Sequence, residues 1–421
     1  MFSGKRVTVM GLGLLGRGVG DAAYLAEQGA EVLVTDLKSK EELQVSVDKL
    51  SHFSNISFVL GEHRLEDFED KDFILKGNGV PLQNKYIEHA QSSGVPIEMS
   101  GALFHAYAGI PMIGVTGTRG KSTITELIHH VLGSRSLLGG NIRGVSNLQL
   151  LKEVEGKEVA TFELDSWQLQ GFGYRKISPQ VAVFSNFMED HLNYYGDMDT
   201  YFMDKAQIFL HQKEDGVLIV GEGVEDRIKE YRSDYIVAKK EDVDFSWVPG
   251  LVGEHNHENV ACAYHALKMH GLSDEEIKKG FLSFAPVEGR LQFVGEYRGV
   301  KVFNDNNATT PTATAAGIAA LKGEGRLIAI IGGADKGLDV SPLVDVLGSV
   351  DHVILLAGSG TEKLGIGGEM FDDIEKALAS AFSIAEECDT ILFSPGFASF
   401  GMFQNEYERN DAFMQALSHF E

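Results

Sequence analysis

Cysteine, proline and basic residues are all scarce in this sequence. Only two cysteines, Cys262 and Cys388, occur in 421 residues, which excludes a disulfide framework and a zinc site built from cysteines. Lysine and arginine total 37 against 61 aspartates and glutamates, giving a net charge of −24 at pH 7. That balance argues against binding to nucleic acid or to an anionic membrane through charge.

Long apolar runs are also missing, because none approaches the roughly 20 residues of a membrane-spanning helix. The first residues, MFSGKRVTVMG, lead into an apolar run without the layout of a signal peptide. We therefore expect a cytoplasmic protein that acts on small molecules, works as a monomer, and has neither nucleic acid nor membrane as a partner.

What the sequence does contain is an alternation of short Val- and Ile-rich runs with segments of helical period. Most runs end in Gly, Asp, Asn or Pro, which is typical of buried parallel strands that meet ligand-facing loops. The pattern predicts an α/β fold. Because 421 residues exceed one ordinary core, we predict three domains, at residues 1–98, 99–286 and 287–421. The runs are RVTVMG, EVLVTD, PMIGVTG, VAVFSN, GVLIVG, RLIAIIGG, HVILLAG and TILFSPG.

The first glycine loop lies in VTVMGLGLLGRGVG, residues 7–20. Gly11, Gly13 and Gly16 are spaced G-x-G-x-x-G, and Asp36 follows a second apolar run. This pattern is the fingerprint of a Rossmann-like dinucleotide site and favours, taken alone, an NAD-dependent oxidoreductase. Backbone N–H groups bind any diphosphate, however, so the loop does not distinguish NAD from UDP.

The second glycine loop follows the run PMIGV and reads TGTRGKST. Gly117 and Gly120 allow backbone N–H groups to surround phosphate oxygens, Lys121 would reach the terminal phosphates, and Ser122 would contact Mg²⁺. The spacing departs from the usual P-loop, since Val115 stands where the first glycine is expected. The order strand, Gly-Lys-Ser, helix nevertheless favours a nucleoside triphosphate site in the second domain.

Three further side chains of the second domain are candidates for the site: one ends a predicted strand, one follows a predicted strand, and one lies on a predicted helix. Glu163 ends the run VATFE, where a carboxylate facing a phosphate loop could hold magnesium or could simply be solvated. His191 comes just after the run VAVFSN, and Lys205 follows on a predicted helix. Isolated residues of these types are more often structural than catalytic, so the residues alone leave their roles open.

Eight motifs in order carry a resemblance to the Mur ligases, and most closely to the branch that adds D-glutamate. This resemblance spans Met1 to Glu421. It implies a Rossmann-like N-terminal domain for a UDP-linked substrate, a central P-loop-type ATPase domain, and a Rossmann-like C-terminal domain for the amino acid. The motifs are GVTGTRGKST, ELDSWQLQ, SNFMEDHLNYYGDMDTYFMDKAQIF, LVGEHNHENVACAYHAL, VEGRLQFV, NDNNATTPTA, GGADKGLD and SPGFASFGMFQNEYERNDAF.

The resemblance implies a peptidoglycan precursor ligase that uses ATP to join D-glutamate to UDP-N-acetylmuramoyl-L-alanine through an acyl phosphate. It assigns catalysis to Lys121, His191 and Lys205, and Mg²⁺ to Ser122, Glu163, His191 and Lys205. The family's lysine at Lys205 is commonly carbamylated, and Mg²⁺ prefers such oxygen ligands. The implied ATP contacts are Gly117, Thr118, Gly120, Lys121, Ser122, Asn259, Arg290 and Asp305.

The same resemblance assigns residues to the other two substrates. The UDP-linked substrate would contact Leu14, Leu15, Asp36, Leu37, Gly79 and Asn141. The incoming amino acid would contact Thr309, Lys336, Ser399 and Phe400. The lysine supplies a positive charge suited to a carboxylate.

Five positions near the substrates depart from the family pattern. Asn307, Gly289, Asp165 and Glu406 stand where lysine, histidine, serine and an aromatic residue are usual, and Arg143 interrupts the family's G-N-I-G. Asn307 removes a positive charge, and Asp165 adds a carboxylate. These changes leave two interpretations open, lineage drift with D-glutamate retained or a different amino acid or UDP-muramoyl substrate. An NAD-dependent oxidoreductase is the alternative from another class.

Overall fold

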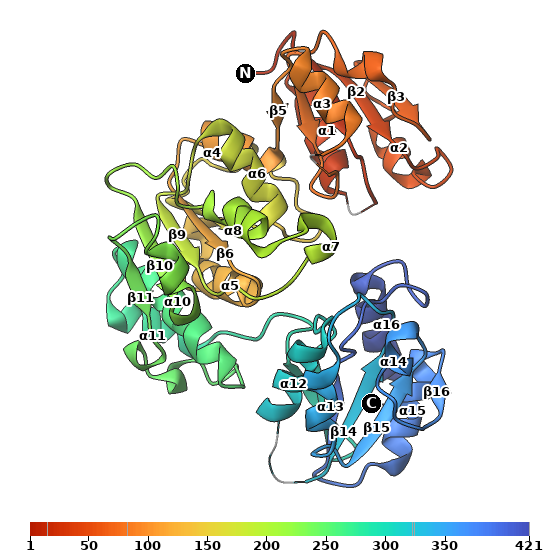
Figure 1. The fold of residues 1–421 in the computed structure, drawn as a ribbon. Coiled ribbons are helices and arrows are strands. Elements are labelled where there is room, and N and C mark those ends of the chain that lie inside the picture. The colour runs from red at the N-terminus through yellow and green to blue at the C-terminus, as the bar shows by residue number, and fades with distance from the viewer. Residues whose placement is uncertain (15, 82, 322, 324, 421) are drawn as a thin grey trace. The chain divides into compact units, whose positions relative to one another are not determined.

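The apolar runs predicted from the sequence all form strands, and the strands assemble into three separate sheets (Figure 1). A computed structural model describes residues 1–14, 16–81, 83–321, 323 and 325–420. Within that part of the chain, every helix is too short or too polar to traverse a bilayer. Three mainly parallel sheets with intervening helices confirm the predicted α/β class.

The first sheet is parallel throughout and has the order β3-β2-β1-β4-β5. Side chains alternate between its faces, so Val7 and Val9 pack on one core and Met10 on another. Its strands are β1 (Arg6–Met10), β2 (Glu31–Asp36), β3 (Ile56–Leu60), β4 (Phe73–Lys76) and β5 (Ile97–Glu98). Its helices are α1 (Arg17–Glu27), α2 (Gln44–Leu50) and α3 (Lys85–Ser92).

The second sheet is also parallel, with the order β11-β10-β9-β6-β8-β7. The phosphate loop leaves β6, which lies in the interior of this sheet. Its strands are β6 (Met112–Thr116), β7 (Ser136–Gly140), β8 (Val159–Glu163), β9 (Val181–Phe184), β10 (Val217–Gly221) and β11 (Ile236–Ala238). The accompanying helices are α4 (Ser100–Tyr107), α5 (Lys121–Leu132), α6 (Ser166–Arg175), α7 (Leu192–Tyr195), α8 (Met198–Ala206), α9 (Glu225–Ile228), α10 (His255–Met269) and α11 (Asp274–Leu282).

The third sheet has the order β12-β13-β17-β14-β15-β16 and is parallel except for the β12–β13 pair. Its strands are β12 (Gln292–Tyr297), β13 (Val300–Asn304), β14 (Leu327–Gly332), β15 (His352–Leu356), β16 (Met370–Phe371) and β17 (Thr390–Phe393). Its helices are α12 (Pro311–Ala320), α13 (Ser341–Leu347), α14 (Ser359–Glu362), α15 (Ile374–Ile384) and α16 (Glu406–Leu417).

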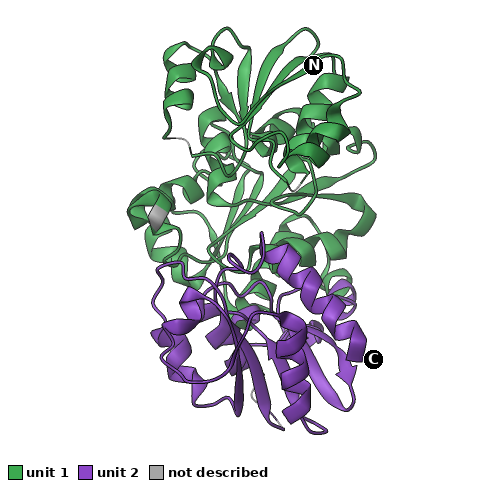
Figure 2. Ribbon diagram, turned by 90° about the vertical axis from the view of Figure 1, so that its right-hand side faces the viewer, with its two compact units in different colours: residues 1–243, 258–278 green, residues 244–257, 279–421 purple. Residues whose placement is uncertain are grey.

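The chain divides into two compact units, coloured separately in Figure 2. Unit 1 comprises residues 1–243 and 258–278 and holds the first two sheets; unit 2 comprises residues 244–257 and 279–421 and holds the third. The three-domain boundaries at residues 98 and 286 stay predictions.

Candidate active site

The phosphate loop joins β6 to α5 and requires glycine. Gly120 precedes α5 with φ +79°, and a Cβ there would lie 2.1 Å from Oδ1 of Asn259. A Cβ on Gly117 would lie 2.1 Å from Oγ of Ser185. Glycine therefore lets the loop turn while the Asn259 amide, from α10, packs directly against it.

Asn186 stabilises this loop, although the sequence analysis did not identify it. Its backbone oxygen accepts a hydrogen bond from N of Thr118 at 3.0 Å, and its Oδ1 accepts from N of Arg119 at 2.8 Å. Its place two residues after the end of β9 could have indicated it, since the loops that follow parallel strands gather at one edge of a sheet.

Two lysines converge on one carbonyl oxygen of the loop. Lys121 Nζ donates to O of Gly117 at 3.0 Å and to O of Thr118 at 3.2 Å. Lys205 Nζ, from α8, donates to the same Gly117 oxygen at 2.8 Å. The structure thus joins two predicted catalytic residues at the predicted phosphate loop.

The environment of Lys205 disfavours its ammonium form. Its side chain is only 1% exposed, and burial lowers its pKa well below the ordinary value. The neighbouring Lys121 charge lowers this pKa further, while Asp165 and Asp190 act in the opposite direction. A buried lysine of low pKa is one that reacts as a neutral amine.

Glu163 and Ser122 form the oxygen-bearing part of the site. Ser122 Oγ donates a hydrogen bond to Oε2 of Glu163, which is buried at the end of β8. Glu163 Oε1 accepts from Nδ2 of Asn141 at 3.2 Å. Among the described residues, no three His, Cys, Asp or Glu side chains form a cluster that could hold a metal ion. One carboxylate with one hydroxyl suits Mg²⁺, which keeps several waters or phosphate oxygens as its other ligands.

His191 lies in an adjoining charged group on the segment between β9 and α8. Asp190 Oδ2 lies 3.4 Å from an Arg119 guanidinium nitrogen and 3.7 Å from Nε2 of His191. The imidazole ring also packs against Trp167, with ring centroids 4.7 Å apart. Asp190 therefore connects the predicted residue His191 to the phosphate loop through Arg119.

Asp165 caps α6 near this group. Its Oδ1 accepts from N of Gln168 at 2.7 Å, in a capping box. Burial raises the pKa of Asp165, whereas that hydrogen bond and the charges of Lys121 and Lys205 lower it. The family's serine at this position would also cap the helix, so the substitution keeps the cap and adds a carboxyl group close to both lysines.

In the first sheet, Asp36 organises the amino-terminal glycine loop. Its Oδ2 accepts from N of Leu12 at 2.8 Å and N of Gly13 at 3.1 Å, while Oδ1 accepts from N of Lys38 at 2.9 Å. Leu14 and Leu37 are 48% and 66% exposed beside this loop. The predicted contact Leu15 lies outside the described residues.

The predicted contact Gly79 lies in the loop after β4, and a buried lysine holds this loop. Lys76 Nζ donates to O of Gly77 at 3.2 Å and to O of Val80 at 2.6 Å. Burial lowers the pKa of Lys76 to about 8, against the charges of Asp165 and Asp204. Sequence reasoning missed Lys76 because a strand-terminal lysine is usually solvated.

In unit 2, Asp305 directly follows β13 and is buried, with hydrogen bonds to its carboxylate. Its Oδ1 accepts from N of Leu291 at 3.0 Å, and its Oδ2 accepts from Oγ of Ser394 at 2.8 Å. Burial raises the pKa of Asp305 to about 7, and the Arg290 charge partly opposes that rise. Two predicted ATP contacts, Arg290 and Asp305, are thus electrostatic neighbours.

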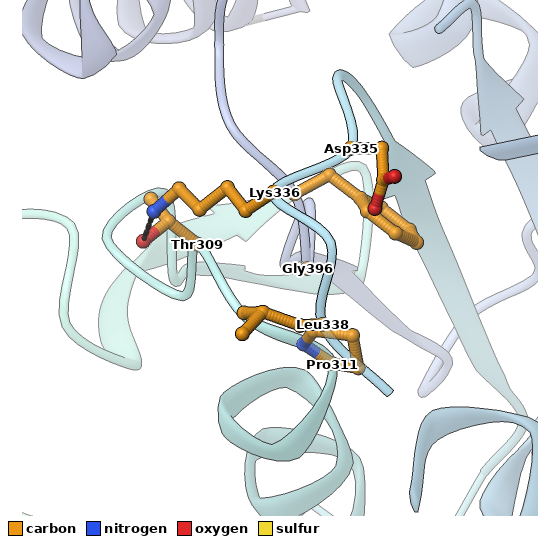
Figure 3. A pocket seen from close by; sticks show the side chains of 7 residues that line it. Thr309, Pro311, Asp335, Lys336, Leu338 and Gly396 are labelled. Carbon is orange, nitrogen blue, oxygen red and sulfur yellow. Dashed lines mark hydrogen bonds between the residues drawn. The ribbon is translucent and has the colours of Figure 1, made fainter. Parts of the chain in front are cut away.

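A small pocket in unit 2 contains two of the predicted amino-acid contacts. Lys336 extends to Thr309, and its Nζ donates to the threonine Oγ1 at 3.0 Å (Figure 3). Asp335 also lines the pocket and forms an ion pair with Lys363. The pocket residues are Thr309, Pro311, Asp335, Lys336, Leu338, Gly396 and Phe397.

Ser399 and Phe400 lie next to this pocket in the chain. Ala334 and Ala398 form an isolated antiparallel bridge, which joins the loop of Lys336 to the segment of Ser399. Ser399 is buried, whereas Phe400 is 63% exposed.

Two of the departures from the family pattern lie against each other. A Cβ on Gly289, whose φ is +70°, would lie 3.2 Å from Nδ2 of Asn307. Asn307 Nδ2 in turn donates to O of Glu288 at 3.2 Å. The Asn307 side chain is therefore hydrogen-bonded to the backbone of the segment that precedes β12. Glu406 contributes its backbone oxygen to Asn306 Nδ2, at 2.8 Å.

Family models match three stretches of the chain in order: a Mur ligase MurD-like N-terminal domain at residues 5–98, a Mur ligase middle domain at residues 115–239, and a Mur ligase glutamate ligase domain at residues 289–397. These stretches hold the glycine loop, the phosphate loop and the pocket described above. The chain belongs to the Mur ligase family. It is thus an enzyme of an ATP-dependent ligase family, as the motifs predicted.

Full-length relatives of this Mur ligase share about a third of its residues. A UDP-N-acetylmuramoylalanine–D-glutamate ligase of Roseiflexus sp. is 34% identical, over 99% of each chain. An enzyme of the same name from Borreliella afzelii is 34% identical, over 97% of this chain and 96% of its own. Another, from Geobacillus kaustophilus, is 32% identical, over 98% of this chain and 97% of its own. Membership in the family removes the basis for the oxidoreductase interpretation of the first glycine loop.

Solved structures share the fold of this chain at low sequence identity. A UDP-N-acetylmuramate–alanine ligase from Thermotoga maritima matches with a TM-score of 0.62 and 17% identity, covering 99% of this chain and all of its own. The MurF ligase of that organism, in complex with ADP, matches with a TM-score of 0.64 and 16% identity, covering 99% of this chain and 95% of its own.

Proposed function

We propose that this Mur ligase adds D-glutamate to UDP-N-acetylmuramoyl-L-alanine, with ATP converted to ADP and phosphate, in peptidoglycan precursor synthesis. The observation that carries the proposal is the convergence of Lys121 and Lys205 on the Gly117 oxygen of the phosphate loop. The reaction brings a substrate carboxylate against a triphosphate, so negative charge must be offset at this place, by Lys121 directly and by Mg²⁺ that a carbamylated Lys205 would help to hold.

The chemistry proceeds in two transfers. The substrate carboxylate oxygen attacks the γ-phosphorus, the bond to the ADP oxygen breaks, and an acyl phosphate forms. The amine of D-glutamate then attacks the acyl carbon, loses a proton, and expels phosphate to leave an amide. Lys121 stabilises charge on the transferring phosphoryl group, and we assign Gly117, Thr118, Gly120, Ser122, Asn259, Arg290 and Asp305 to ATP.

Glu163 and Ser122 have the donor types for one Mg²⁺, and we assign His191 and Lys205 to a second. Mg²⁺ supplies charge neutralisation of phosphate oxygens when bound. The ammonium form of Lys205 offers no lone pair, so its role as a ligand requires carbamylation. The low pKa of Lys205 supports that modification, because CO₂ reacts only with the neutral amine.

We assign the other two substrates to two further groups of residues. We assign Leu14, Leu15, Asp36, Leu37, Gly79 and Asn141 to the UDP-linked substrate. The pocket of Thr309 and Lys336, with Ser399 and Phe400, would take D-glutamate. The Lys336 ammonium, held by Thr309 Oγ1, matches the charge of the side-chain carboxylate.

The direct test is phosphate release with UDP-N-acetylmuramoyl-L-alanine and ATP, supplied in turn with D-glutamate, L-glutamate, D-aspartate and meso-diaminopimelate. Turnover with D-glutamate alone is the expected result. Turnover only with another amino acid would refute the D-glutamate assignment and favour altered specificity, in line with the neutral Asn307 amide that is hydrogen-bonded to O of Glu288. Absence of turnover with every amino acid would refute ligation of this substrate.

A further inference from the structure

Arg17 occupies the first position of α1, directly after the third glycine of the amino-terminal loop. Its guanidinium donates to Oδ1 of Asn141 at 2.7 Å, across 124 residues of chain. Within the described residues, the Arg17 side chain forms this one hydrogen bond, whereas a guanidinium carries five N–H donors. The side chain is half-buried, so its charge faces limited screening.

Asn141 continues the connection toward the nucleotide. Its Oδ1 accepts from Arg17, while its Nδ2 donates to Oε1 of Glu163 at 3.2 Å. Glu163 Oε2 accepts the hydrogen bond of Ser122. Four side chains thus form an unbroken polar chain from the amino-terminal glycine loop to the phosphate loop, all within unit 1.

We propose that Arg17 binds the diphosphate of the UDP-linked substrate and, through Asn141, positions Glu163. This inference rests on the proposed function and adds a substrate contact to it. Asp36 already occupies N–H groups of Leu12 and Gly13, so the loop backbone alone offers a reduced set of donors to a diphosphate. Arginine supplies paired donors and a permanent charge that suit phosphate oxygens.

The inference that Arg17 positions Glu163 rests on the Asn141 amide. The amide oxygen can only accept hydrogen bonds, and the NH₂ group can only donate them. Arg17 requires the oxygen of Asn141, and this leaves the NH₂ group for Glu163. A ligand that holds the guanidinium at the glycine loop therefore holds the amide and orders the Glu163 carboxylate. By reciprocity, MgADP on the phosphate loop strengthens UDP binding to the same extent that UDP strengthens MgADP binding.

The test compares ligand binding by the full-length wild type and Arg17→Leu, using isothermal titration with UDP and with uridine. We expect UDP to bind about 10-fold or more weakly to Arg17→Leu, while the affinity for uridine is unchanged. Arg17→Lys keeps the charge without the paired donors and should give an intermediate loss. Arg6→Leu, an exposed arginine on β1 of the same sheet, is the matched control and should bind UDP normally.

A second titration measures UDP binding with and without MgADP. The wild type should bind UDP more tightly in the presence of MgADP, and Arg17→Leu should lose most of this effect, which a purely structural role would not remove. Equal UDP affinity of wild type and both Arg17 variants would overturn the diphosphate contact. Weakened UDP binding with an intact MgADP effect would overturn the connection through Asn141. A wild type that binds no UDP would instead refute the proposed function itself.

Discussion

Lys121 and Lys205 donate hydrogen bonds to the same oxygen, the carbonyl of Gly117, over 3.0 and 2.8 Å. Burial lowers the pKa of Lys205 well below its ordinary value, and the repulsion of the Lys121 ammonium at the same acceptor lowers it further. This geometry supports separate roles in the proposed reaction: Lys121, which is only half-buried, would contact phosphate oxygens, and the fully buried Lys205 would react as an amine.

Carbamylation of Lys205 predicts a dependence of activity on dissolved CO₂. Turnover should fall when CO₂ is stripped from the buffer and return with bicarbonate, because the carbamate is reversible. Lys205→Ala should lose about 100-fold or more of the rate. Mass spectrometry under native conditions checks the modification, and the exposed Lys229→Ala variant should match the wild type. Full activity without CO₂ would rule the carbamate out.

Replacement of Lys121 by alanine should abolish phosphate release while the fold survives. The ammonium provides charge for the transferring phosphoryl group, and removal of such a cation costs about 1,000-fold or more. Its ammonium donates to the loop carbonyls of Gly117 and Thr118, and the side chain is only half-buried, so circular dichroism should be unchanged. Lys157→Ala is the control, since Lys157 also donates to a backbone carbonyl, that of Ser134. Near-normal turnover of Lys121→Ala would contradict the assignment.

Asp305 should make the stability of the protein depend on pH. Its pKa in the folded state, about 7, lies above the ordinary 3.8, so the folded state holds this proton more tightly. The associated stabilisation is complete below about pH 4 and is lost as pH rises through 7.

Chemical unfolding at pH 5 and pH 8 tests this effect by comparison of wild type with Asp305→Asn. The free energy of unfolding of the wild type should decline more steeply between these pH values, by on the order of a few kcal/mol. The Asn variant keeps an acceptor for N of Leu291 or Oγ of Ser394. Identical pH slopes would show that Asp305 does not titrate in this range.

Lys336→Met should raise KM for D-glutamate by about 10- to 100-fold, because a charge-assisted hydrogen bond to the carboxylate is lost. KM for ATP should change little. Lys363→Met is the control, since Lys363 pairs with Asp335 beside the same pocket but is not assigned to the amino acid. Similar KM values for D-glutamate in wild type and Lys336→Met would place that carboxylate elsewhere.

Arg409→Met should destabilise unit 2 by about 2–5 kcal/mol. The buried guanidinium donates to Oδ1 and O of Asn306 at 2.9 and 2.8 Å and to O of Phe397 at 3.0 Å. Removal of the guanidinium leaves these acceptors unpaired. Those of Asn306 lie shortly before Thr309, and that of Phe397 belongs to a residue that lines the pocket of Thr309 and Lys336. Urea unfolding provides the measurement, and Arg135→Met, at a partly exposed ion pair with Glu158, should change little. Unchanged stability would mean that water replaces the guanidinium.

The sequence by itself determined the strands, the α/β class and the two glycine loops. These features depend on local properties: apolar runs that must be buried, and glycines at φ values that other residues rarely adopt. The motif order added the family and its ligase activity. The pattern VATFE placed Glu163 at a strand end but left open whether its carboxylate is solvated, and the structure buries it beside Ser122.

Only the tertiary structure decided which side chains meet. The contact between Lys205 and Gly117 joins residues 88 positions apart, and that between Arg17 and Asn141 joins residues 124 positions apart. The structure also showed that Asp36, predicted to contact the UDP-linked substrate, accepts hydrogen bonds from N of Leu12 and N of Gly13 in the glycine loop. Such pairings depend on strand order and helix packing, which place distant loops at one edge of a sheet. Local periodicity carries no information about that placement.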